Sequence, residues 1–248
     1  MARLAAAMPA PTPCPTAASK PAALRGLMAA ISLETPPTVT SGHPALDREI
    51  GGGWPLGQVV ELCCAGAGWG EVSLCLPALA TRGKVAWVLP PGRQAQTNRQ
   101  AYAPALGAHL RLADQLFIQT NQTRDAAWAA EQVLRSGAVG GLLAWLPATS
   151  PEADFRLLRR LQLQASRHAC LTFVWRESKP AAASPAALRI EVRGLNAEGE
   201  VELQLLKRRG SPLPAPVSLS LHPRRWAERQ AFPALFPFAS DRRQVLPV

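Results

Sequence analysis

A glycine-rich turn between a predicted strand and a predicted helix is the feature of this sequence that could bind phosphate. Its glycines are Gly66, Gly68 and Gly70. Such a turn lets backbone N–H groups approach phosphate oxygens, but nucleotide chemistry also needs a Lys for the β- and γ-phosphates and a Ser or Thr for Mg²⁺. Here Glu71 and Val72 follow. A carboxylate repels a triphosphate and an isopropyl group binds no metal, so the glycines predict a tight turn and no cofactor.

No arrangement of residues indicates a metal centre or a catalytic site. The cysteines form no C-x-x-C pair and no zinc-type spacing with histidine, and the histidines are scattered along the chain. Cysteines in apolar runs predict small buried side chains, and an odd count without a framework predicts a reducing compartment. We therefore expect no enzyme and no metal. The cysteines in apolar runs are Cys63, Cys64, Cys75 and Cys170, and the fifth cysteine is Cys14. The histidines are His43, His109, His168 and His222.

A helix predicted over residues 152–167 carries a basic face. At about 100° per residue, its arginines share one arc, and Phe155 with most of the leucines falls on the opposite arc, while Leu163 lies among the arginines. One interpretation is a solvated face over a core stripe. The other is a surface for DNA phosphates or for an acidic partner. The arginines are Arg156, Arg159, Arg160 and Arg167.

Residues 222–248 form a predicted tail in which arginines alternate with aromatic side chains. That composition is typical of a segment that folds as it binds a partner, and Arg and Trp are common interface anchors. A disordered terminus, or one packed against the core, is the other interpretation. The candidate partner-binding residues are Arg224, Arg225, Trp226, Arg229, Phe232, Phe236, Arg242 and Arg243.

Composition predicts a globular chain with an acidic partner. The chain has 248 residues, 48% of them hydrophobic, and 27 Lys and Arg against 17 Asp and Glu give a net charge of +10. Its 24 prolines are about twice the average share, and several lie in residues 1–37, which we predict to be a flexible tail. That proline-broken segment is not a signal peptide, and no apolar run suits a membrane helix. We expect a cytoplasmic protein.

The elements between the tails predict an α/β domain over residues 38–221. Short apolar strands at 58–64, 84–89, 116–119, 141–146 and 170–175 alternate with helices ending near 79 and at 98–105, 123–136 and 152–167. This order predicts a mostly parallel sheet with helices on both faces. Alternating apolar and polar residues at 188–193, 200–207 and 216–221 then predict an antiparallel C-terminal extension.

The stretch Thr40-Ser-Gly-His-Pro-Ala-Leu-Asp-Arg-Glu-Ile-Gly-Gly-Gly-Trp-Pro-Leu-Gly-Gln-Val-Val-Glu-Leu resembles the start of the RecA recombinase core. Leu134-Arg-Ser-Gly-Ala-Val and Leu206-Lys-Arg-Arg extend the likeness. Within that superfamily the degenerate loop and the Arg-Arg-Trp tail resemble the ImuA family of translesion-synthesis proteins. SulA, a related cell-division inhibitor, is the nearest alternative.

The departures from the RecA pattern agree with one another. Trp145 stands where the resemblance implies a metal-binding Asp, and Pro90-Pro91 where it implies a water-activating Glu. Trp175 and Arg176 displace the sensor amides. Phosphoryl transfer needs several of these groups together, so the resemblance implies a fold that has lost ATP binding.

The resemblance implies a non-enzymatic adaptor of the SOS mutagenesis machinery. Its implied partners are an ImuB-type inactive homologue of the Y-family polymerases, an error-prone polymerase, and RecA itself. The alternative is a SulA-like inhibitor that binds the tubulin-like division protein. The loop at residues 178–185 has no aromatic residue for base stacking, and the sequence leaves open whether the protein contacts DNA directly.

Overall fold

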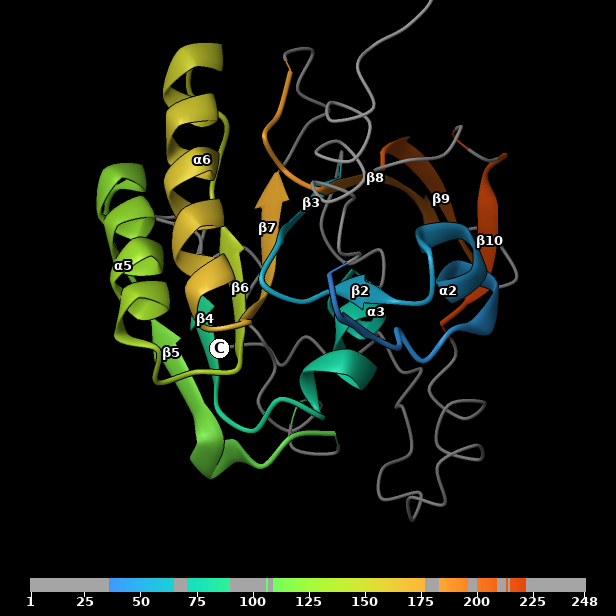
Figure 1. Ribbon diagram of the computed structural model, residues 1–248, viewed down its shortest axis with the longest axis horizontal. Coiled ribbons are helices and arrows are strands. Elements are labelled where there is room, and N and C mark those ends of the chain that lie inside the picture. The colour runs from blue at the N-terminus through green and yellow to red at the C-terminus, as the bar shows by residue number, and fades with distance from the viewer. Residues whose placement is uncertain are drawn as a thin grey trace, which may run out of the picture. The chain divides into compact units, whose positions relative to one another are not determined.

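An eight-stranded sheet forms the centre of the described part of the chain (Figure 1). The computed structural model describes residues 36–64, 71–89, 106, 109–176, 183–195, 200–208, 213 and 215–221, and these belong to one compact unit that begins at Pro36. The sheet order is β10-β9-β8-β3-β7-β6-β4-β5. Its strands are β3 (Val59–Cys64), β4 (Val85–Val88), β5 (Gln115–Ile118), β6 (Gly141–Trp145), β7 (Leu171–Arg176), β8 (Leu188–Leu195), β9 (Glu200–Lys207) and β10 (Val217–Ser220).

The sheet is mostly parallel, as the alternation of strands and helices predicts. Neighbouring strands from β8 through β3, β7, β6 and β4 to β5 run parallel, whereas β9 is antiparallel to both β8 and β10. Residues 188–193, for which an antiparallel strand was predicted, lie in β8, which pairs antiparallel with β9 and also in parallel with the buried strand β3. That pairing buries Leu188, Ile190 and Val192 in the central layer.

Four α-helices are present among the described residues: α2 (Pro44–Ile50), α3 (Glu71–Leu79), α5 (Thr123–Ser136) and α6 (Pro151–Arg167). The predicted bounds of α5 are confirmed, and α6 begins one residue earlier than predicted. Ser150 caps α6 by accepting a hydrogen bond from the Ala153 backbone N–H at 3.3 Å, and a proline at the first helical position has no N–H to leave unpaired. Nothing in our sequence analysis predicted α2, nor a short 3₁₀ turn at Leu112–Asp114.

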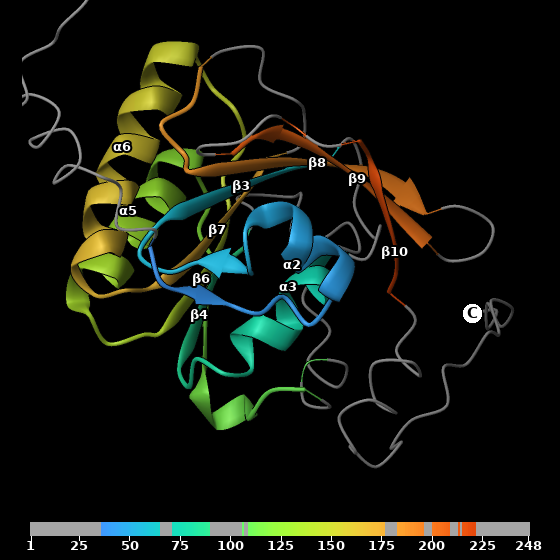
Figure 2. The same cartoon turned by 45° about the vertical axis from the view of Figure 1, so that its right-hand side comes forward.

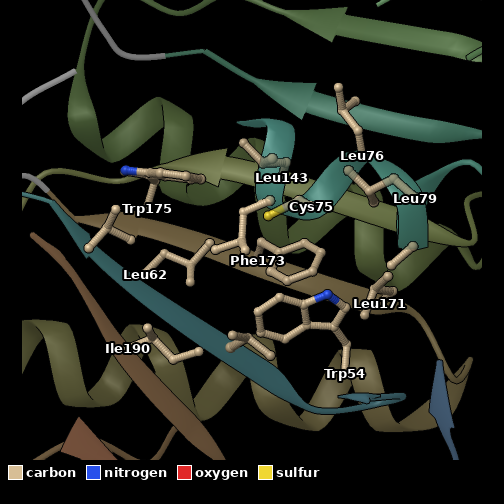
Figure 3. Close-up of a cluster of buried hydrophobic side chains, with 14 of the residues drawn as sticks. Trp54, Leu62, Cys75, Leu76, Leu79, Leu143, Leu171, Phe173, Trp175 and Ile190 are labelled. Carbon is tan, nitrogen blue, oxygen red and sulfur yellow. The ribbon is translucent and has the colours of Figure 1, made fainter. Parts of the chain in front are cut away.

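Helices cover both faces of the sheet. Helices α5 and α6 lie on one face and bury their apolar side chains with Val59, Val174 and neighbouring sheet residues (Figure 1). Helices α2 and α3 lie on the other face and pack on a larger cluster (Figure 2). In that cluster the rings of Trp54 and Phe173 meet edge to face, 5.1 Å apart between centroids (Figure 3).

A two-stranded ribbon places Trp54 in this core. Strand β1 (Thr38–Val39) pairs with β2 (Trp54–Pro55). Gly53, just before Trp54, has a φ of 138°, and a Cβ there would lie 2.3 Å from the Val39 carbonyl oxygen. The close approach of the two backbones therefore requires glycine, and the ribbon holds the segment that leads into β3.

Several predictions concern segments outside the described residues. They are the helix at 98–105, the hairpin turn at 196–199, the glycine-rich turn at 65–70, and nearly all of the two predicted tails. Within the ranges that are described, no helix has both the length and the apolar character needed to cross a membrane.

Candidate functional site at the carboxyl edge of the sheet

The carboxyl ends of β3, β7, β6 and β4 meet at one edge of the sheet. In open parallel sheets this edge is where ligands bind. The predicted glycine-rich turn follows β3 in the sequence, but Gly66, Gly68 and Gly70 lie outside the described residues. Beyond it, Glu71 begins α3, and Val72 is half-buried against the larger cluster. In the described part of the chain, the chemistry of this edge therefore depends on the residues at the strand ends.

A row of aromatic rings crosses the edge on the face covered by α2 and α3. Phe117 of β5 stacks on Trp87 of β4 at 6.0 Å, Trp87 on Trp145 of β6 at 6.5 Å, and Trp145 on Trp175 of β7 at 5.9 Å. We call these four residues the aromatic row. Three of them are buried, and Phe117 is exposed at the outer strand. Figure 3 shows Trp175 in the cluster with Leu143 and Phe173.

The aromatic row makes this face of the edge apolar. Trp145 and Trp175 occupy the same register at neighbouring strand ends, with their rings tilted by only 24°. Ring pairs of this kind contribute about 0.5–1.5 kcal/mol beyond the area they bury. The Trp87 indole N–H donates a hydrogen bond to the Gln115 side-chain oxygen at 2.9 Å. Trp145 and Trp175 thus place packed aromatic carbon at the carboxyl ends of β6 and β7.

The opposite face of the same edge holds a buried chain of ion pairs. The Glu61 carboxylate of β3 forms one ion pair with Arg189 of β8 at 2.8 Å and another with Arg176 of β7 at 3.5 Å. Arg176 also reaches Asp154 of α6 at 3.2 Å. The side chains of Arg176 and Glu61 are 0% and 1% exposed. We call these four residues the buried ion chain, and its two cations and two anions balance in charge.

Arg176 fixes the connection from β6 to α6. Its Nη1 donates to the Pro147 carbonyl oxygen at 3.3 Å as well as facing Asp154. Asp154 in turn accepts from the Thr149 hydroxyl at 2.9 Å. A buried charge is costly unless it is paired and hydrogen-bonded, so the edge and the start of α6 are held in one arrangement. The Nη2 of Arg176 is buried and has no hydrogen-bond partner in the part of the chain that the structure describes.

Cys63, near this edge, and Cys170, which precedes β7 at the opposite edge of the sheet, are inert at neutral pH. Burial, with the charge of Glu61 adding to it, raises the pKa of Cys63 to about 12. Burial raises the pKa of Cys170 to about 11. Both thiols therefore stay protonated, which suits neither a nucleophile nor a metal ligand. The prediction that Cys63, Cys64, Cys75 and Cys170 are buried is confirmed, and the described residues contain no group of three or more potential ligands that could hold a metal ion.

The predicted basic helix face lies on α6, away from the sheet. Arg156, Arg159, Arg160 and Arg167 are all exposed. The prediction that Phe155 belongs to the core stripe is wrong, because that side chain is 43% exposed. Gln162 takes the buried place instead, since its amide bonds the Val59 N–H at 2.9 Å and the Gly57 carbonyl at 3.0 Å.

The structure does not bring the predicted site residues together. Among these residues it describes the α6 arginines, Glu71 and Val72, whereas the glycines of the predicted turn and the eight candidates in residues 222–248 lie outside the described residues. Sequence reasoning missed the buried ion chain. Its signal was Glu61, an acidic residue inside an otherwise apolar strand, which must find a cation when it is buried.

Comparison with models of protein families and with curated proteins found no match to this chain.

Proposed function

We propose that this chain is a RecA-like protein of the ImuA type that no longer binds ATP and serves as an adaptor in SOS-induced translesion synthesis. The mostly parallel sheet with helices on both faces supports the RecA-like assignment. The antiparallel strands β9 and β10 fit the C-terminal extension that the sequence predicts. The signature that begins at Thr40 covers α2, β2 and the first part of β3.

One observation carries the proposal: Trp145 stacks on Trp175 at the carboxyl ends of adjacent strands. In the proposed alignment these strand ends are where an ATPase of this fold keeps its metal-binding carboxylate and its sensor amides. A buried indole coordinates no metal and cannot sense a phosphate. The proposed site therefore has the strand arrangement of such an ATPase without the groups that bind metal and phosphate, which supports a role in binding other proteins.

The proposed partners follow from the resemblance. They are an ImuB-type inactive Y-family polymerase homologue, an error-prone polymerase and RecA, in the cytoplasm. The protein would hold these components together near damaged DNA, and catalysis would belong to the polymerase. The candidates for contact are the tail residues 222–248 and the exposed face of α6.

The test of the lost nucleotide site is calorimetric titration of the full chain with ATP and Mg²⁺. We expect no binding heat up to millimolar ATP, whereas a RecA control titrated in the same buffer gives a saturable signal. ATP binding with a micromolar dissociation constant would overturn the assignment of Trp145 and Trp175 to a closed, apolar edge.

A further inference from the structure

Exposed apolar side chains lie among the arginines of α6. Phe155, Arg159, Leu163 and Arg167 follow one another at intervals of four residues, so they form one row along the helix. All four are exposed, Phe155 to 43% and Leu163 to 49%. A solvated face needs no leucine at its centre. This strip therefore offers both apolar contacts and contacts with positive charge.

The arginines around Leu163 have little internal compensation. Arg160 pairs with Glu131 of α5 at 3.1 Å, and Arg167 bonds the Gln164 side chain at 3.2 Å. Arg156 and Arg159 form no ion pair with any residue that the structure describes. The acids of α6 lie in its first turn, and Asp154 is held by Arg176 in the buried ion chain. The middle of the strip therefore keeps an unbalanced positive charge.

Helix α5 adds a third apolar side chain beside this strip. Trp128 is 64% exposed, the largest exposed fraction among the large apolar side chains described. It precedes Glu131 by three residues, which places both on one side of α5, and Glu131 contacts Arg160. The two helices run side by side on this side of the molecule (Figure 1). Trp128 therefore lies about one helical turn from the contact of Glu131 with Arg160 between the two helices.

We propose that this surface, the α5–α6 outer face, binds an acidic amphipathic segment of a partner protein. It comprises Trp128, Phe155, Arg156, Arg159, Leu163 and Arg167. Partner carboxylates would pair with the guanidinium groups, and partner apolar side chains would cover Leu163 and the two rings. Trp and Arg are the residues most enriched at energetically dominant interface positions. The proposal deepens the adaptor function and rests on it for the biological role of the partner.

A nucleic acid fits this face less well. Phosphate groups are bound through positive charge alone, and bases are bound by stacking on aromatic side chains. The residue that the arginines surround is Leu163, which offers no stacking plane. A nucleic acid would leave this leucine uncovered, whereas a peptide with its own apolar side chains buries it.

The test is fluorescence anisotropy of the full chain with three labelled probes. The first is a Glu- and Leu-containing amphipathic peptide of about five turns, matched to the length of α6. The second has the same charge with every Leu replaced by Gln, and the third is an oligothymidylate of equal charge. We expect the first probe to bind at least about tenfold more tightly than the others, because only it buries apolar area.

Matched variants assign any binding to this face. Leu163→Asp should weaken the amphipathic probe by about tenfold or more, and Leu112→Asp, at a site of similar exposure (47%) on the 3₁₀ turn, should leave binding unchanged. Circular dichroism checks that both variants are folded. Equal binding of the first two probes, tighter binding of the oligonucleotide, or indifference to Leu163→Asp would overturn the proposal. These results are independent of the ATP titration, so the face can fail while the lost nucleotide site stands.

Discussion

Arg176 touches three elements through one guanidinium group. It faces Glu61 of β3, Asp154 of α6 and the carbonyl of Pro147 between β6 and α6. Removing one partner of such a buried set is more damaging than replacing the whole set, because it leaves a charge without compensation. The stability of the carboxyl edge therefore depends on single side chains.

Glu61→Gln should destabilise the fold by about 3–5 kcal/mol, because Arg176 and Arg189 then share a buried site without the carboxylate between them. Urea unfolding followed by circular dichroism measures the change. Glu202→Gln is the matched control, since Glu202 pairs with Arg193 at 2.8 Å on the surface and should cost at most about 1 kcal/mol. Equal losses in the two variants would show that the buried ion chain adds nothing.

Cys63 gives the stability a dependence on alkaline pH. Its pKa is raised from 9.0 to about 12 in the fold, chiefly by burial. Below pH 9 the thiol is protonated in both the folded and the unfolded chain. As pH rises from 9 toward 12, the unfolded chain ionises first, so the free energy of unfolding falls over this window.

The Cys63→Ala variant tests this dependence. We expect it to lose less stability than the parent chain between pH 8 and 10.5, as measured by urea unfolding at each pH. Cys170, whose pKa is also raised by burial, continues to titrate in both chains. Identical pH slopes in the two chains would contradict the assignment of Cys63 to a buried, neutral thiol.

Helix α6 is joined to the sheet by a side-chain amide rather than by apolar packing alone. Gln162 satisfies the Val59 N–H and the Gly57 carbonyl at the start of β3. This contact sets the rotation of α6 about its axis, and it turns Phe155 and Leu163 outward. The α5–α6 outer face is thus a consequence of a buried glutamine.

Gln162→Leu should destabilise the protein by about 1–3 kcal/mol, because two backbone groups lose their partner in a buried place. The shape of the side chain is nearly kept, so the loss reports the hydrogen bonds. Gln164→Leu, on the more exposed side of the same helix, serves as the control and should change stability by less than about 0.5 kcal/mol. A Gln162→Leu variant as stable as the parent would mean that α6 is held by apolar contacts alone.

Local signals predicted the elements whose causes are local. The residue pattern of 123–136 predicted α5 with its observed bounds, and the apolar run at 58–64 predicted β3. Phe155 was misplaced, because Gln162, through its hydrogen bond to Val59 of β3 more than a hundred residues away, occupies a buried position of this helix. Helix α2 was missed because it is short and is stabilised by Asp47, which accepts bonds from Thr40 and Ser41.

The positions of the aromatic residues in the candidate site were predictable from the sequence, but the contacts of its charged residues were not. The sequence places Trp145 and Trp175 at strand ends, and the parallel register brings them together. No periodicity indicates that Arg176, Glu61 and Asp154 meet, because they come from two strands and a helix that lie far apart in the chain. The indication of that pairing in the sequence was Glu61, an acidic residue in an otherwise apolar strand.

At the scale of the whole molecule, the arginines are concentrated in two separate segments of the chain. One is the exposed face of α6, and the other is the arginine- and aromatic-rich segment 222–248. An adaptor needs more than one contact surface, since it must hold two partners together. The apolar carboxyl edge and the two basic segments are consistent with that division.

Deleting residues 222–248 should abolish or strongly weaken capture of the Y-family polymerase homologue in a pull-down with purified proteins. The reason is that arginine and aromatic anchors carry most of the binding energy in interfaces of this kind. Thermal unfolding of the truncated chain checks that the domain stays folded. Undiminished capture by the truncated chain would contradict the assignment of partner binding to this segment.

The central claim is that the protein joins translesion partners without using nucleotide. The most direct measurement is light scattering coupled to gel filtration of the full chain mixed with the Y-family polymerase homologue, with and without ATP and Mg²⁺. We predict a stoichiometric complex of the same mass in both conditions. A complex that forms only with ATP, or no complex with this partner but one with the tubulin-like division protein, would contradict the claim.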